Sequence, residues 1–247
     1  MPETTFWRRT DTDRPKRAAP YSGRRQIMRI GLFGGTFNPV HYGQLRVALE
    51  VCEAFSLDVC HLIPSSEPPH KTAVGLARAE DRLNMIRTAI AGTPCLQVSD
   101  AEITRSGPSY TIDTVRHFQA SASSPSDLYL MIGRDAFQEL HTWKSMDALL
   151  DTIPLIVMNR PTKQTNRLDR KAIETYLNTH APGGNYRFSE TDACFSDTIR
   201  PPIYFFDVTL LDISSTDIRQ RVREGRSIRY LVPPQVDAYI NDKGLYR

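Results

Sequence analysis

The sequence predicts an α/β protein with a doubly wound, mostly parallel sheet, built as a single domain behind a disordered N-terminal extension. Short apolar runs alternate with helical periods along the chain, and this order requires right-handed crossovers between parallel strands. The 247 residues are enough to bury one sizeable core. The first apolar run leads directly into a glycine turn and a helix, and doubly wound sheets bind ligands at such strand ends.

Six apolar runs predict the strands, and they fall at residues 29–33, 59–63, 96–99, 128–132, 154–158 and 203–208. The first helix is the clearest, because Leu45, Ala48, Leu49, Cys52 and Phe55 form one apolar stripe at helical spacing. Further helices are expected at residues 78–91, 111–120, 145–150, 167–179, 216–224 and 234–241. We expect the polar segment 161–200 to be a largely irregular insertion.

Charge and cysteine usage separate the extension from the folded body, residues 28–247. Residues 1–27 hold seven Lys and Arg against three acids, so the body carries 24 basic and 25 acidic residues. We therefore expect no nucleic-acid partner. For the extension, two alternatives stay open: a nucleic-acid-binding arm, and a start codon assigned too early, with Met28 as the true start. The extension has no apolar core typical of a secretory signal, and no run in the chain is long enough to span a membrane.

The four cysteines are widely spaced, with no C-x-x-C and no paired Cys/His spacing. Structural zinc and a disulfide framework are therefore not expected, and a reduced, cytoplasmic compartment fits this usage.

The stretch GGTFNPVHYGQL, residues 34–45, is the first candidate for chemistry. The chain has no Walker-type phosphate loop and no G-x-G-x-x-G after the first strand. Gly34 and Gly35 allow the backbone to approach a ligand closely. We expect His41 in the first helical turn, with Gln44 three residues later on the same helix face, a site suited to an anion. A tight strand-to-helix turn with a capping histidine is the alternative.

The stretch ISSTDIR, residues 213–219, is the second candidate. Ser214 and Asp217 match an S-x-x-D capping box, which by itself needs no function. Three hydroxyls at a helix N-terminus, together with Arg219, would also form a phosphate cradle. Both interpretations stay open for this stretch alone.

Together these stretches resemble the nucleotidyltransferase superfamily, whose signature is H-x-G-H near the first strand. Three more stretches, EPPHK (67–71), GPSYTIDT (107–114) and IGRDAF with HTWK (132–144), resemble bacterial nicotinate-nucleotide adenylyltransferases. The ending YLVPPQVDAYINDKGLYR is similar to that family as well. The resemblance covers residues 28–247.

The resemblance implies a Rossmann-like nucleotidyltransferase fold and the transfer of an adenylyl group from ATP to nicotinate mononucleotide. The products would be nicotinate adenine dinucleotide and pyrophosphate, in NAD biosynthesis. The attacking phosphate oxygen is already ionised near neutral pH, so no general base is required. The expected partners are ATP, which carries Mg²⁺, and nicotinate mononucleotide. No protein-only metal site is visible, no membrane is expected, and the oligomeric state stays open.

The resemblance also implies roles for individual residues. Thr111 would hold the nicotinate end, Trp143 would stack on the pyridine ring, and Asp135 would contact ribose hydroxyls, with core packing for Trp143 and helix capping for Asp135 as alternatives. Arg160 would reach the mononucleotide phosphate. The expected catalytic set is His41, Gln44 and Arg219; the ATP-binding set is Gly35, Thr36, Phe37, Ser214, Ser215 and Thr216; the substrate-binding set is His70, Lys71, Thr111, Gly133, Asp135, Trp143 and Arg160.

Gln44 departs from the family, which has a second histidine at this position. A glutamine amide donates neutral hydrogen bonds only, and these are weaker than charge-assisted ones. We therefore expect activity at a lowered rate. Two alternatives stay open: a transferase for another phosphorylated acceptor, and a catalytically weakened nucleotide-binding or regulatory protein. Preference for nicotinate over nicotinamide mononucleotide is also left open by the sequence.

Overall fold

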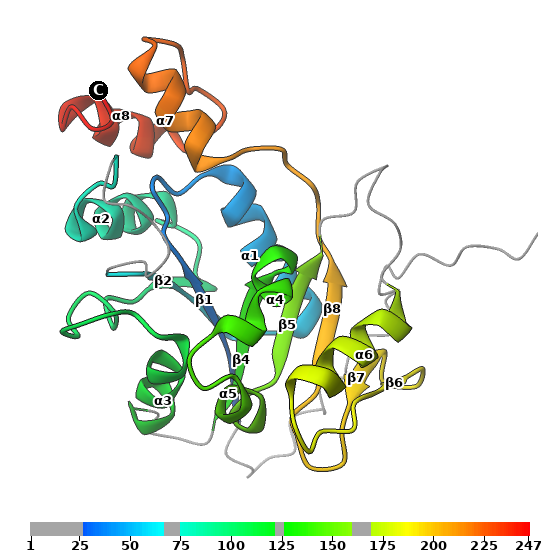
Figure 1. Ribbon diagram of the computed structural model, residues 1–247. Coiled ribbons are helices and arrows are strands. Elements are labelled where there is room, and N and C mark those ends of the chain that lie inside the picture. The colour runs from blue at the N-terminus through cyan, green and yellow to red at the C-terminus, as the bar shows by residue number, and fades with distance from the viewer. Residues whose placement is uncertain (1–26, 67–74, 122–125, 160–168) are drawn as a thin grey trace, which may run out of the picture.

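The computed structural model describes residues 27–66, 75–121, 126–159 and 169–247 (Figure 1). Eight strands form one sheet in the order β3-β2-β1-β4-β5-β8-β7-β6. The strands are β1 (Met28–Gly35), β2 (Val59–Pro64), β3 (Leu96–Val98), β4 (Ser126–Gly133), β5 (Leu155–Asn159), β6 (Arg187–Ser189), β7 (Cys194–Ser196) and β8 (Ile203–Asp207). Strands β1 to β5 and β8 run parallel to one another, whereas β6 and β7 form an antiparallel edge. The predicted doubly wound, mostly parallel sheet is therefore confirmed.

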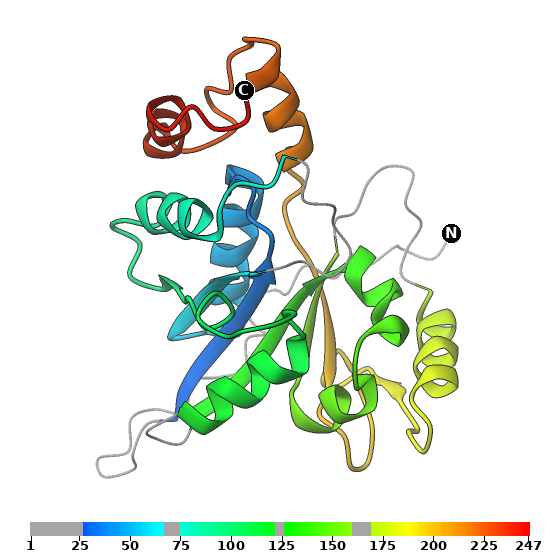
Figure 2. The ribbon, with the colours of Figure 1, turned by 60° about the vertical axis from the view of Figure 1, so that its left-hand side comes forward.

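Helices cover both faces of this sheet (Figure 2). They are α1 (Tyr42–Phe55), α2 (Ala79–Ala89), α3 (Thr111–Ser121), α4 (Arg134–Gln138), the 3₁₀ helix η1 (Leu140–Thr142), α5 (Met146–Thr152), α6 (Arg170–His180), α7 (Ser215–Arg223) and α8 (Pro234–Asp242). Among the described residues, no helix combines the length and the apolar character that a membrane crossing requires.

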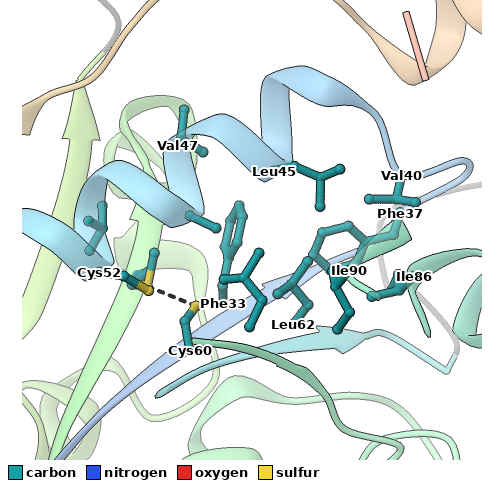
Figure 3. Packing of buried hydrophobic residues seen from close by; sticks show 14 of the residues in the cluster. Phe33, Phe37, Val40, Leu45, Val47, Cys52, Cys60, Leu62, Ile86 and Ile90 are labelled. Atoms are coloured by element: carbon teal, nitrogen blue, oxygen red, sulfur yellow. Dashed lines mark hydrogen bonds between the residues drawn. The ribbon is translucent and has the colours of Figure 1, made fainter. Parts of the chain in front are cut away.

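Alternation along the buried strands divides the core into two layers. On β1, Phe33 packs with residues from α1, α2, α7 and α8, while its neighbour Leu32 packs with residues from α3 to α6. Figure 3 shows the first layer, in which Phe33 and Leu62 of the sheet lie beneath Leu45 of α1. Successive strand side chains point to opposite faces, so a sheet covered on both sides needs continuous apolar strands.

The order of the strands reverses between β1 and β4. From β1 the chain moves outward to β2 and β3, then returns to place β4 on the other side of β1. The carboxyl ends of β1 and β4 therefore form the topological switch point, where open parallel sheets bind their ligands. Helices α7 and α8 and the C-terminus lie at this same end of the molecule (Figures 1 and 2).

All six predicted strands and all seven predicted helices are present, with ends shifted by at most about three residues. Strands β6 and β7 were not predicted: segment 161–200 was expected to be largely irregular, yet its described part adds two strands beside β8. Helices α4 and η1 were also missed, since five and three residues are too short to show a period. Residues 1–26, nearly all of the predicted extension, lie outside the described residues.

Candidate active site

The loop after β1 is shaped by a buried aromatic ring. Phe37 is 1% exposed and has a φ of 48°, a left-handed conformation that is unusual for a bulky residue. A Cβ placed on Gly35 would lie 3.1 Å from Cε2 of this ring, so only glycine fits here without displacing Phe37. Such local strain is typical of functional loops. Gly35 ends β1 and Thr36 follows it, so both lie at the switch point.

His41 lies at the end of this loop and is 4% exposed. The sequence placed His41 in the first turn of the helix, but its extended backbone, with φ at −145°, makes it the residue that caps α1. A Cβ on Gly43 would lie 3.1 Å from the imidazole Nδ1, so a larger residue at this position would require the imidazole to shift. The helix N-terminus and the imidazole thus adjoin the same loop.

Gln44 is close to His41, as its spacing predicts, but its carbonyl oxygen is directed at the backbone. Oε1 of Gln44 accepts a hydrogen bond from the His41 backbone N–H at 3.2 Å. This bond belongs to a capping box between His41 and Gln44, the capping arrangement given above as the alternative, and the joint action of the two side chains on a ligand stays a prediction. Only the amide NH₂ of Gln44 remains to donate toward a ligand.

The N-terminus of α7 packs directly against the loop before His41. Ser214 caps α7 by accepting a hydrogen bond from the Asp217 N–H at 3.0 Å. The Ser215 hydroxyl donates to the carbonyl oxygen of Pro39 at 2.9 Å, and Arg219 Nη1 donates to the carbonyl oxygen of Asn38 at 2.9 Å. Two stretches that are 176 to 181 residues apart in sequence at these contacts therefore meet, as predicted.

Arg219 lies beside the N-terminus of α7 with its guanidinium partly buried. Its Nη2 donates to the Thr216 hydroxyl at 3.3 Å, while its Nε is buried with no hydrogen-bond partner within the described residues. Burial lowers the pKa of Arg219, although the side chain stays cationic at physiological pH. A partly desolvated cation beside hydroxyls and a helix N-terminus favours binding of phosphate oxygens.

Arg82 of α2 belongs to the same region and was missed by the sequence analysis. Its side chain is 1% exposed and burial lowers its pKa. Nη1 donates to the carbonyl oxygens of Thr36 and Ser65 at 2.9 and 2.7 Å, and the other two nitrogens donate to Ser66 and Ala77. Arg82 therefore ties the loop after β1 to the end of β2.

A sequence signal for Arg82 exists. Arg82 precedes Met85 and Ile86 by three and four residues, so it lies on the apolar stripe of α2, where a charged side chain needs buried partners. Asn38, also missed, is 5% exposed and bonds to several segments at once.

The predicted mononucleotide-binding residues fall at neighbouring strand and helix ends. Gly133 ends β4, Asp135 is exposed in the first turn of α4, and Thr111 begins α3. Half-buried Trp143 packs against the second core layer.

Lys144 joins the Trp143 segment to the start of α3. Its Nζ lies 4.1 Å from the Tyr110 ring centroid and 3.5 Å from Asp113 Oδ2, so Trp143 and Thr111 belong to adjoining segments. His70, Lys71 and Arg160 lie outside the described residues.

No group of three or more His, Cys, Asp or Glu side chains in residues 27–66, 75–121, 126–159 and 169–247 is arranged to hold a metal ion. The donors around the β1 loop are instead backbone N–H groups, hydroxyls and guanidinium groups. These groups suit an anionic ligand such as a polyphosphate.

Comparison with known proteins gives consistent matches. A family model described as cytidylyltransferase-like matches residues 32–221. A probable nicotinate-nucleotide adenylyltransferase of Desulfatibacillum aliphaticivorans is 43% identical over 221 residues, covering 89% of this chain and 100% of the relative. A probable nicotinate-nucleotide adenylyltransferase of Pseudomonas fluorescens is 40% identical over 226 residues, covering 89% of this chain and 97% of the relative.

Among solved structures, the nicotinic acid mononucleotide adenylyltransferase of Plasmodium falciparum complexed with NaAD is similar, with a TM-score of 0.65. The alignment covers 89% of this chain and 97% of that chain at 16% sequence identity, a likeness of fold.

Proposed function

The chain belongs to the nicotinate-nucleotide adenylyltransferase family, and we propose that it transfers the adenylyl group of ATP to nicotinate mononucleotide. The products are nicotinate adenine dinucleotide and pyrophosphate, in a step of NAD biosynthesis. The resemblance on which this function was predicted is confirmed by the relatives, which align over nearly their whole length. The observation that carries the proposal is the meeting of the His41 loop with α7 at the switch point of the sheet.

The reaction replaces one phosphoanhydride bond by another. An oxygen of the mononucleotide phosphate forms a bond to the α-phosphorus of ATP, and the bond from that phosphorus to the bridging α,β oxygen breaks. The electron pair of the broken bond leaves with pyrophosphate. The attacking oxygen is ionised near neutral pH, because the second pKa of a phosphate monoester is about 6. The protein therefore has to align the reactants and stabilise charge rather than remove a proton.

The triphosphate would bind between the β1 loop and α7. We assign the backbone of Gly35, Thr36 and Phe37 and the imidazole of His41 to one side of it. The hydroxyls of Ser214 and Thr216, the backbone N–H of Ser215 and the guanidinium of Arg219 would lie on the other, because the Ser215 hydroxyl already donates to the carbonyl oxygen of Pro39. Donors fixed in this way stabilise charge that develops at the α-phosphate and on the departing pyrophosphate, without reorganising during the reaction. The Mg²⁺ carried by ATP would neutralise part of the phosphate charge.

The mononucleotide would bind across the carboxyl end of β4. We assign Trp143 to the face of the pyridine ring and Thr111 to its carboxylate end. Asp135, in the turn after Gly133, would accept hydrogen bonds from ribose hydroxyls. His70 and Lys71 would lie on the substrate side, and Arg160 would reach the mononucleotide phosphate. Gln44 would contribute its amide NH₂ beside His41.

Purified protein incubated with Mg²⁺, ATP and nicotinate mononucleotide tests the proposal. We expect stoichiometric release of pyrophosphate and nicotinate adenine dinucleotide. His41→Asn should lower kcat by about 100-fold or more, the cost of removing one transition-state donor. His117→Asn is the matched control, because His117 is exposed on α3 and should leave kcat unchanged.

Two outcomes would contradict the proposal. Absence of pyrophosphate release with nicotinate mononucleotide, in a folded protein that binds ATP, would favour a nucleotide-binding protein. Release only with a different phosphorylated acceptor would identify another transferase of the superfamily. Nicotinamide mononucleotide, tested in parallel, measures the preference between the carboxylate and the amide.

A further inference from the structure

We propose that Tyr246, near the C-terminal end of the chain, is a positioning residue for the ATP site and acts through the side chain of Asn38. The proposal rests on the function given above. It assigns a catalytic consequence to a C-terminal residue that none of the predicted site sets contains.

Asn38 joins three segments at the β1 loop. Its Nδ2 donates to the carbonyl oxygen of Gly75 at 2.9 Å, and its Oδ1 accepts from the Ala77 N–H at 3.0 Å. The same Oδ1 accepts a hydrogen bond from the Tyr246 hydroxyl at 2.7 Å. The backbone carbonyl of Asn38 accepts from Arg219. The position of Asn38 therefore fixes both the course of the loop that leads to His41 and one end of the Arg219 guanidinium.

The turn after α8 delivers Tyr246 to this place. Gly244 has a φ of 60°, and its N–H donates to the carbonyl oxygen of Asn241, in the last turn of α8, at 3.2 Å. The next N–H, from Leu245, donates to the carbonyl oxygen of Ile240 at 3.0 Å. This pair of bonds is a Schellman motif, which reverses the chain direction at a helix end. Leu245 then packs against the first core layer.

The hydroxyl of Tyr246 acts as a donor over the whole physiological range. Burial raises the pKa of Tyr246 well above its ordinary value, while the nearby cations Arg219 and Arg82 oppose this rise. The neutral phenol therefore lies beside the two guanidinium groups that contact the β1 loop. A hydroxyl in this position can hold Asn38 without adding a negative charge where phosphates would bind.

A second tyrosine provides an internal control. Tyr239 is on α8 and its hydroxyl donates to Asp81 of α2 at 2.9 Å. It joins α8 to α2, and no hydrogen bond of Tyr239 to the β1 loop occurs among the described residues. Both hydroxyls belong to the C-terminal segment and both bond to a polar side chain, but only Tyr246 reaches Asn38.

The test compares Tyr246→Phe with Tyr239→Phe in the full-length protein. Each variant removes one hydroxyl and keeps the ring, so both are expected to fold, and thermal unfolding will verify this. We expect Tyr246→Phe to raise KM for ATP or lower kcat/KM for ATP by about 3- to 10-fold, the range that one hydrogen bond supports. KM for nicotinate mononucleotide should change by less than about twofold. Tyr239→Phe should leave both KM values and kcat unchanged.

A double-variant comparison tests the route through Asn38. If Tyr246 acts by holding Asn38, Tyr246→Phe should have little further effect in an Asn38→Ala background. The proposal would be overturned if the two tyrosine variants lost the same activity. It would also be overturned if kcat fell in proportion to the melting temperature while both KM values stayed unchanged. Additive effects with Asn38→Ala would also overturn it. The wild-type protein is assayed first, and an absence of turnover there refutes the proposed function. If the wild type turns over and the Tyr246→Phe substitution changes none of its kinetic constants, only this inference is refuted.

Discussion

Arg82→Met is the substitution that tests most strongly how the site is held together. Arg82 is a buried cation, and its hydrogen bonds within the described part of the chain go to four backbone carbonyls, those of Thr36, Ser65, Ser66 and Ala77. Methionine has a similar length and can fill the space, so the change removes the bonds and the charge while retaining most of the packing.

The expected cost follows from these bonds. A hydrogen bond that involves a charged group contributes about 1.5–3 kcal/mol, and a buried acceptor left without a donor costs about 1–3 kcal/mol. Ser65 and Ser66 are half-buried, so water can reach their carbonyl oxygens. Not all four carbonyls would therefore be left without a hydrogen-bond partner in the variant. We expect a loss of about 3–5 kcal/mol in the free energy of unfolding, because two or more of these carbonyl oxygens would be left without a donor.

Urea unfolding at about pH 7 measures this loss. Arg87→Met on the same helix is the matched control, because Arg87 is exposed and bonds only to Asn84 among the described residues. It should change the free energy of unfolding by no more than about 0.5 kcal/mol. If the free energies of unfolding of Arg82→Met and Arg87→Met differed by less than about 1 kcal/mol, the Arg82 guanidinium would not be stabilising the loop after β1, and the reasoning would fail.

Three further expectations follow from the site and the fold. Gln44→His should raise the turnover number, since a second imidazole can donate a charge-assisted bond; an unchanged or lower value would count against this. Trp143→Ala should raise KM for nicotinate mononucleotide about fivefold and leave KM for ATP nearly unchanged, as the loss of one aromatic stacking contact predicts; equal changes in both KM values would argue for a packing role. Burial of Glu50 is outweighed by hydrogen bonds from Thr209 and Arg46, so the pKa of Glu50 lies below its ordinary value. Its contribution to stability is therefore complete above the unfolded pKa of about 4.3 and is lost as pH falls through the folded pKa. The stability gap between wild type and Glu50→Gln should narrow as the pH of urea titrations is lowered from about 7 to about 3, and a constant gap would contradict the assignment.

The parallel sheet was predictable because its strands are apolar on both faces. Runs such as LYLMI in β4 need no long-range information, since a strand covered by helices on both sides must be apolar throughout. The strands β6 and β7 are three residues each and exist by pairing with one another and with β8. A run of three residues carries no alternation, so these strands depend on tertiary contacts that a local pattern does not contain.

The motifs of the candidate site were predictable from the sequence, but the residues that hold these motifs in place were not. Gly35 and Arg219 lie within recognisable stretches, and the structure brings those stretches into contact. The role of Gln44 was only partly predictable, because spacing gives its neighbour but not the direction of its amide. The Tyr246 hydroxyl bonds to Asn38 across 208 residues of sequence, and a tyrosine near the chain end gives no local sign of this partner.

A crystal structure with Mg²⁺ and an α,β-methylene analogue of ATP would locate the triphosphate. We expect it between the β1 loop and α7, with phosphate oxygens within hydrogen-bond distance, about 2.7–3.2 Å, of both the His41 imidazole and the Arg219 guanidinium. A triphosphate bound elsewhere, or one that contacts only one of these two groups, would contradict it.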